Sequence, residues 1–253
     1  MIILLSPSKT LDFQKLSNSS YHIEPVFKKE SQAIIKVLQK KSPDSLMSMM
    51  GISRNLAMLN VGRYNQWETE NASVKEAVFA FKGDVYTGLD AETMSETDLE
   101  FAQRHLRILS GLYGWLRPLD LIQAHRLEMG TKLPVGKHEN LYAFWQKKVT
   151  AQLLTELKHL NSDLIINLAS NEYFHVIGNK LPDIQFVSPV FKEYKNGEYK
   201  IVSFFAKKAR GLMASFIIRN QIEQPEDLIA FDLEGYHFNA GISTHENPVF
   251  TRG

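Results

Sequence analysis

The sequence contains no cysteine among its 253 residues. Disulfide bonds, thiolate zinc sites, iron–sulfur clusters and catalysis by a thiol are therefore excluded. Neither sign of charge dominates, because 29 Lys and Arg stand against 28 Asp and Glu, a formal net charge of +1. An anionic partner must consequently be held by a local cluster of cations and not by the overall field of the protein.

The sequence also lacks long apolar runs and targeting signals. No run approaches the roughly 20 apolar residues that a membrane-spanning helix needs. The first residues, MIILLSPSKT, have no basic segment before the apolar stretch and no small-residue cleavage site, so they are typical of a strand and not of a signal peptide. We therefore expect a cytoplasmic protein.

Apolar patterning predicts a single α/β (mixed α+β) domain over residues 1–253. Continuous apolar runs indicate strands at 2–5, 78–86, 106–109 and 163–170. Helical spacing or capping indicates helices at 25–41, 43–50, 54–66, 95–105, 140–160 and 206–220. The pair Asn196-Gly197 indicates an antiparallel hairpin within 184–204. We expect a mixed, partly antiparallel sheet surrounded by helices, with a peripheral tail from about 239 to 253.

The helix expected at 206–220 carries Lys207, Lys208 and Arg210 close to its start. A helix N-terminus is already positive, so three cations there are unfavourable unless an anion binds beside them. No acidic residue lies between Glu198 and Glu223 to neutralise them. The pattern favours an anion site, although a solvated basic edge is also consistent with it.

Two further groups of polar residues are candidates for a site. The arginines of the first group are interleaved with Tyr113 and Trp115, as in stacking contacts with nucleotides or in an ordinary packed turn; they are Arg104, Arg107, Arg117 and Arg126. In the second group, Lys9 follows the first strand, at the carboxyl end where open α/β sheets build their sites. Lys82, Asp84 and Tyr86 of this group surround a glycine turn and form a plausible polar constellation.

Metal and hydrolase motifs are absent from the sequence. The eight histidines form no pair at a spacing of three or four, and a Glu-x-x-His such as Glu172 with His175 does not make a carboxylate di-iron site without the further carboxylates that such a site needs. No Gly-x-Ser-x-Gly nucleophile elbow occurs. We predict no metal site, no cofactor and no identifiable catalytic residue.

The stretch LMSMMGISRNLA, residues 46–57, has two interpretations. It is either a turn between two packed helices or a helix-hairpin-helix whose backbone amides bind a phosphate. The spacing of that motif places Gly51 at the tight turn and Ser53 where the second glycine usually stands. Serine can cap the second helix, but it adopts a positive φ less readily than glycine.

Five runs together resemble the YaaA family of peroxide stress resistance proteins, from Met1 to about Phe238. They are SPSKTLDF (6–13), FKGDVYTGL (81–89), LSGLYGWLRPLDLIQAHRLEMG (109–130), INLASNEYF (166–174) and FFAKKARGLMASFIIRN (204–220). The resemblance implies a cytoplasmic protein that limits damage from unincorporated iron during peroxide stress. It also implies an α/β fold with a basic cleft, a helix-hairpin-helix and binding to duplex DNA.

On this resemblance the expected DNA- or anion-binding residues fall into two sets. The hairpin set is Gly51, Ile52, Ser53, Arg54 and Asn55, and the cleft set is Lys9, Lys82, Arg107, Lys207, Lys208 and Arg210. Without a thiol, protection from peroxide must be indirect. The leading hypothesis is binding to duplex DNA without sequence preference. The alternative is an enzyme for a small phosphorylated or anionic substrate, supported by Asp84, Tyr86, Asn167 and Glu172; direct iron binding has the least support.

Overall fold

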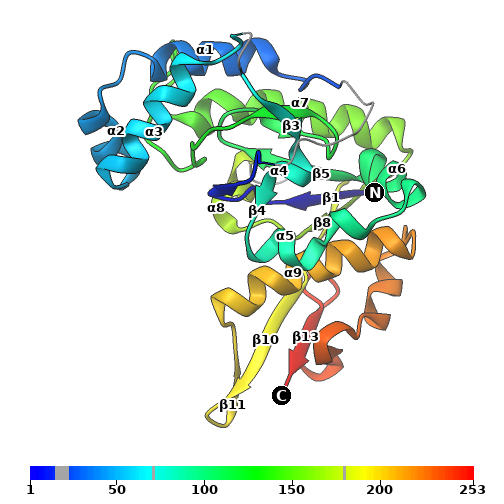
Figure 1. The fold of residues 1–253 in the computed structure, drawn as a ribbon. Helices are drawn as coiled ribbons and strands as arrows, with labels where there is room; N and C mark the ends of the chain where they lie inside the picture. The colour runs from blue at the N-terminus through cyan, green and yellow to red at the C-terminus, as the bar shows by residue number, and fades with distance from the viewer. Residues whose placement is uncertain (15–22, 70–71, 179–180) are drawn as a thin grey trace.

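The computed structural model describes residues 1–14, 23–69, 72–178 and 181–253. Its central sheet has five strands in the order β6-β5-β1-β8-β9 (Figure 1). The parallel strands are β1 (Ile2–Leu5), β5 (Leu106–Ser110), β8 (Leu164–Asn167) and β9 (Gln185–Val187). The edge strand β6 (Gly114–Leu116) runs antiparallel to β5. The mixed sheet expected from the sequence is confirmed.

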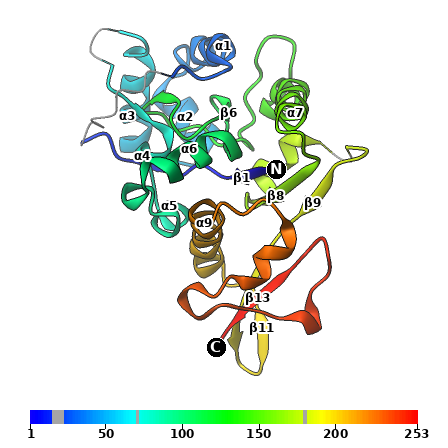
Figure 2. The same ribbon diagram turned by 90° about the vertical axis from the view of Figure 1, so that its right-hand side faces the viewer.

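Strand β1 is central because every one of its residues is apolar and fully buried. Helices α7 (Leu141–His159) and α9 (Ser203–Arg219) lie on opposite sides of the sheet (Figures 1 and 2). Helix α6 (Glu96–His105) precedes β5 and begins with the expected cap, in which Ser95 and Asp98 exchange hydrogen bonds with each other's backbone. Covering both faces of the sheet produces the continuous apolar runs seen in the sequence.

Three helices form a separate group at one end of the molecule (Figure 1). They are α1 (Lys28–Leu38), α2 (Pro43–Met50) and α3 (Arg54–Asn65), close to the predicted bounds. Leu46 of α2 and Ala57 of α3 are fully buried between them. The hairpin of helices is therefore anchored by a small apolar contact, and the turn at 51–53 projects from it.

The prediction of a single strand at 78–86 is wrong. This segment forms helix α4 (Ala77–Ala80), the short strand β4 (Phe81–Lys82) and helix α5 (Asp84–Leu89). The chain bends at Gly83, whose φ of 121° only glycine adopts readily. Two small two-stranded sheets flank it: β2 (Thr10–Leu11) pairs with β4, and β3 (Val74–Glu76) pairs with β7 (Leu121–Gln123).

A second sheet follows the first, in the order β11-β10-β13-β12. The predicted hairpin is confirmed as β10 (Val190–Lys195) and β11 (Glu198–Lys200), with Asn196 and Gly197 both at positive φ. The segment expected to be a peripheral tail contributes β13 (Val249–Arg252), which lies between β10 and β12 (His237–Phe238). Phe250 is fully buried there, so the end of the chain is part of the second sheet.

Helix α9 lies between the two sheets and crosses α5 at close range (Figure 1). The remaining helical segments are short: α8 (Asn171–Phe174), Ala91–Thr93, His175–Ile177, Pro225–Ala230, Leu233–Gly235 and Ala240–Ile242. Among the described residues, no helix combines the length and the apolar character needed to cross a membrane.

Candidate functional site

The carboxyl ends of β1 and β8 meet at the topological switch point of the sheet, the place where open α/β folds have their ligand crevice. The chain leaves β1 toward β5 on one side and leaves β8 toward β9 on the other, so connections diverge between these two strands. Ser6 and Ser170 follow the two strands and close the crevice. The Ser170 amide donates to Ser6 Oγ at 2.9 Å, and the two hydroxyl oxygens lie 3.3 Å apart.

Lys9 lies at this end of the sheet but has an acidic partner. Its Nζ is 2.7 Å from Glu128, which also accepts from Arg126 at 3.3 Å. Glu128 comes from a segment far along the chain, so the sequence around Lys9 gave no sign of it. The nearby Glu172 is likewise engaged, since its Oε1 accepts from the Gly130 amide at 3.1 Å. The crevice therefore contains both signs of charge.

Lys82 and Tyr86 border the same crevice through the β2–β4 pairing. Lys82 pairs with Thr10 in that sheet, and its ammonium lies 2.5 Å from Glu92. The Tyr86 hydroxyl donates to the Ser6 carbonyl at 3.1 Å. Burial raises the pKa of Tyr86 well above its usual value, so the phenol stays protonated and acts as a hydrogen-bond donor.

The cations of α9 are placed differently from the expectation. The helix begins at Ser203, so Lys207 and Lys208 lie in its second turn and the free amides of the helix end belong to residues 203–205. Lys208 is paired with Glu234 at 2.5 Å, an acid outside the stretch between Glu198 and Glu223. Lys207 is exposed. Arg210 is half-buried and lines a separate pocket between α9 and the end of β8.

Arg107 does not belong to a surface site, contrary to the expectation. It is 5 % exposed, and its Nε donates to Glu156 of α7 at 2.6 Å. The guanidinium also donates to the carbonyls of Gln103 and Arg104 at the end of α6. Burial lowers the pKa of Arg107, while Glu156 opposes that shift. An arginine on a strand covered on both faces needs such an internal partner.

The rest of the first basic group differs in burial. Arg104 is exposed, Arg126 is half-buried, and Arg117 pairs with the fully buried Asp120 at 2.8 Å. Tyr113 and Trp115 belong to the core, so the packing interpretation of these two aromatic residues applies. Neither of the two rings is therefore exposed for stacking on a nucleotide.

The turn between α2 and α3 has the geometry of a tight hairpin. Gly51 is left-handed, with φ 63° and ψ 40°, and the amides of Gly51 and Ile52 both donate to the Met47 carbonyl. Ser53 has φ −66° and ψ 159°, the usual conformation of an N-cap. Since no positive φ is required at this position, serine fits it without strain. Ile52 is buried and fixes the turn against the helices.

This turn leaves three backbone amides without an intrahelical acceptor. Ser53 Oγ accepts from the Leu56 amide at 3.4 Å, which satisfies one donor of the first turn of α3. The amides of Ser53, Arg54 and Asn55 have no carbonyl one turn earlier, as at any helix start. All three residues are exposed. Arg54 lies 3.1 Å from Asp44, a pair so exposed that water can readily compete for it.

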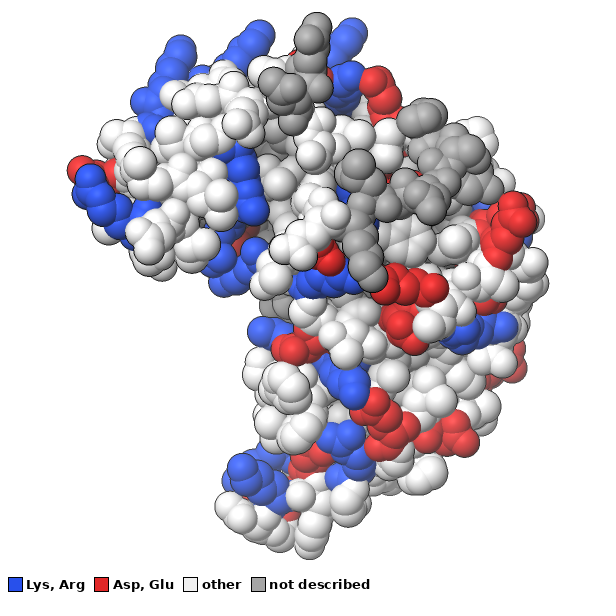
Figure 3. Space-filling model, viewed as in Figure 1, with Lys and Arg blue, Asp and Glu red and all other residues white. Residues whose placement is uncertain are grey.

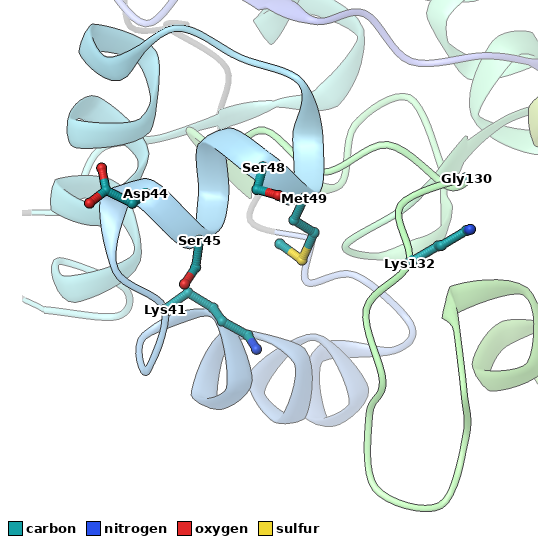
Figure 4. Close-up of a pocket in the computed structure, with 7 residues that line it drawn as sticks. All are labelled: Lys41, Asp44, Ser45, Ser48, Met49, Gly130 and Lys132. Carbon is teal, nitrogen blue, oxygen red and sulfur yellow. The ribbon is translucent and has the colours of Figure 1, made fainter.

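Two more lysines, which the sequence did not single out, lie next to this helix pair. Lys41 and Lys132 line a pocket of about 800 Å³ between α2 and the loop at 130–132 (Figure 4). Ser45 and Ser48 of α2 form its polar wall. In Figure 4 Lys41 extends beneath α2, and Lys132 stands on the facing loop. No local pattern connects the two lysines, because the fold alone brings their segments together.

The molecule is hollowed on the side that carries these elements (Figure 3). The α2–α3 pair forms one rim of the hollow and the β10–β11 hairpin forms the other (Figures 1 and 3). Lys and Arg side chains stand along its walls with some acidic side chains among them (Figure 3). Within residues 1–14, 23–69, 72–178 and 181–253, no group of three or more His, Asp or Glu is arranged to hold a metal ion.

Comparison with known proteins agrees with the resemblance seen in the five sequence runs. A family model described as peroxide stress protein YaaA matches residues 1–241. A protein from Shewanella denitrificans named UPF0246 protein is 50% identical over 254 residues, which cover 100% of this chain and 98% of that protein. The chain therefore belongs to the YaaA family of peroxide stress proteins, and its general role lies in the response to oxidative stress.

Proposed function

We propose that the protein binds duplex DNA through its phosphate backbone, with the α2–α3 turn as the principal contact. The observation that supports this proposal is the turn at Gly51–Ser53, which opens α3 with three exposed residues whose amides have no intrahelical acceptor. Backbone amides at a helix start, together with the helix dipole, form a ready site for one phosphate group. Such contacts carry no information about sequence, so binding should not depend on it.

The hollow provides room and cations for further phosphates. Lys41 and Lys132 line the pocket beside α2, and Lys207 is exposed on α9. Lys9, Lys82 and Lys208 are paired with single acids at exposed or half-exposed positions, where a phosphate can compete with the carboxylate. Counting the turn and these lysines, contact with roughly four to six phosphates is expected.

The β10–β11 hairpin, on the opposite rim of the hollow, adds exposed aromatic side chains to the lysines just described. Tyr194 is 54% and Tyr199 37% exposed, and their rings pack edge to face across the β10–β11 hairpin. Lys195 at the tip of the hairpin is exposed as well. An aromatic pair beside a lysine suits contact with sugars and exposed bases.

This proposal gives the stress role a physical form. With no cysteine, the chain cannot destroy peroxide through a thiol, so protection must act on the target or on the supply of iron. We infer that the protein shields DNA from damage caused by unincorporated iron. Its cytoplasmic location and its effect on iron stay predictions from the family resemblance.

The test is a titration of the purified protein with two duplexes of equal length and unrelated sequence, followed by fluorescence anisotropy. We expect equal affinities, in the micromolar range or weaker at physiological salt, and a log–log salt slope of about −4 to −5. A hundredfold higher affinity for one of the two sequences would contradict recognition of the DNA backbone. A salt slope near zero would contradict the proposed contacts with phosphates.

A second candidate is an enzyme that acts on a small phosphorylated substrate in the crevice between β1 and β8. The observation that favours it is the gathering of Ser6, Ser170, Tyr86 and the Lys9–Glu128 pair at the topological switch point. The test is release of inorganic phosphate from a panel of sugar and nucleoside phosphates, with Lys9→Ala as the control. No release above the Lys9→Ala background would rule this candidate out.

A further inference from the structure

A small pocket of about 320 Å³ lies at the end of β8, beside the crevice. Its walls come from the segment after β8, the segment joining β9 to β10, and α9. Among the described residues that line it, Arg210 of α9 is the only charged one, and the polar lining is completed by Asn167, Asn171, Ser188 and Asn247. Phe174 and Phe191 supply apolar wall. The pocket therefore offers donors and one positive charge, and no carboxylate.

Arg210 has no ion pair or hydrogen bond with any residue that the structure describes, whereas the buried Arg107 is paired with Glu156. Burial lowers the pKa of Arg210, and no acid opposes the shift. A guanidinium remains charged in proteins all the same, so a half-buried positive charge is left without a counter-charge. Leaving such a charge unpaired is costly, and an anion in the pocket would remove the cost.

The side-chain amides that line the pocket are arranged as a site for an anion requires. Asn167 Oδ1 accepts from the Ala169 amide at 3.1 Å, and its Nδ2 donates to Ser188 Oγ at 3.3 Å. The amide is thereby fixed in orientation, and the Ser188 hydroxyl hydrogen is left to donate to a ligand. Asn171 and Asn247 present exposed side chains at the mouth. Hydroxyl and amide groups around one arginine are typical of sites for phosphate or carboxylate groups.

We propose that this pocket binds a small metabolite through a phosphate or carboxylate group, with Arg210 as the counter-charge. Its volume lies at the lower end of the range for small-molecule sites, and it is too small for a segment of duplex. The apolar wall at Phe174 and Phe191 would contact the uncharged part of such a molecule. This inference does not depend on DNA binding. Arg210 is accordingly assigned to the pocket and not to the residues proposed to contact DNA.

The experiment is thermal unfolding with inorganic phosphate or acetate as the probe and chloride at matched ionic strength as the reference. Arg210→Gln is the test variant, and Lys158→Gln, an exposed lysine of α7 outside both the pocket and the proposed DNA contacts, is the matched control. At about ten times Kd, phosphate or acetate should raise the Tm of the parent and of Lys158→Gln by about 3 °C. The rise should be absent in Arg210→Gln. A response to phosphate alone identifies a phosphorylated ligand, and a response to acetate alone identifies a carboxylate.

Asn171→Ala is the second variant, because its exposed side chain can be removed without opening the core. Asn171→Ala should weaken the binding of phosphate or acetate about fivefold or more. This variant therefore tests the pocket even if Arg210→Gln fails to fold. The proposal is overturned if neither probe stabilises the parent at 50 mM, or if the folded variants of Arg210 and Asn171 respond as the parent does. Duplex affinity, measured in parallel, should change less than twofold in Arg210→Gln.

Discussion

Two places in the molecule depend on glycine for opposite reasons. At Gly51 the φ of 63° calls for glycine, yet no atom lies within 4 Å of where a Cβ would stand. At the crossing of α5 and α9, a Cβ on Gly88 would lie 2.2 Å from the Lys208 carbonyl oxygen, and one on Gly211 would lie 1.8 Å from that of Val85. The crossing uses glycine for close packing. The turn uses it for backbone shape and leaves its surroundings open to a ligand.

The largest effect is expected at the crossing. Gly211→Ala forces the two helices apart and should lower the free energy of unfolding by about 3 kcal/mol or more, measured by urea denaturation. The control is Gly62→Ala in the middle of α3, where nothing lies within 4 Å of the added Cβ. That substitution should stabilise the protein by about 0.5–1 kcal/mol. A small effect of Gly211→Ala would mean that the crossing is not tightly packed.

The second largest effect is expected on the stability of the protein at acidic pH, through a histidine of the packed region. His125 is buried against Phe81 and Tyr113, and burial lowers its pKa to about 4. The unfolded chain binds a proton below about pH 6.5, while the folded chain stays neutral there. Stability is therefore fully present above pH 6.5 and is lost as the pH falls toward 4, by up to about 3 kcal/mol. His125→Gln should flatten the dependence of Tm on pH in this range; an unchanged dependence would refute the assignment.

The smallest effect is expected at the exposed edge of the turn. Arg54→Ala should make the log–log salt slope of duplex binding less negative by about one unit, without changing the stability of the protein. Its matched control is Asp44→Asn, which frees Arg54 from its exposed partner and should tighten binding slightly. If Arg54→Ala leaves the slope unchanged, the side chain makes no phosphate contact and any grip at the turn comes from the amides alone.

The sequence predicted the parts of the fold whose signal is local. Strands β1 and β8 are buried on both faces and appear as continuous apolar runs, while Ser95 and Asn196-Gly197 mark a helix start and a hairpin. Residues 78–86 misled because a short apolar run has no period long enough to separate a helical turn from a strand. Gly83 ends that run with a bend that only the tertiary structure reveals.

The site was less predictable because its electrostatics depend on distant segments. Glu128 beside Lys9 and Glu234 beside Lys208 come from other parts of the chain, so local charge patterns overstated the free positive charge. Arg107 was misplaced for a related reason, since its partner Glu156 lies on α7. Ser53 was the exception: the cap it forms was predicted from its position alone, and the negative φ makes a second glycine unnecessary.

The most direct test of the central claim compares duplex binding by Gly51→Val and Gly51→Asn. Asparagine tolerates the left-handed conformation, whereas a β-branched residue does not, and nothing lies within 4 Å of the Cβ that either residue would add. We expect Gly51→Val to bind every duplex about tenfold more weakly and Gly51→Asn to bind as the parent does, with folding verified by thermal denaturation. A folded Gly51→Val variant that binds duplexes as tightly as the parent would show that residues 46–57 are only a turn between two packed helices.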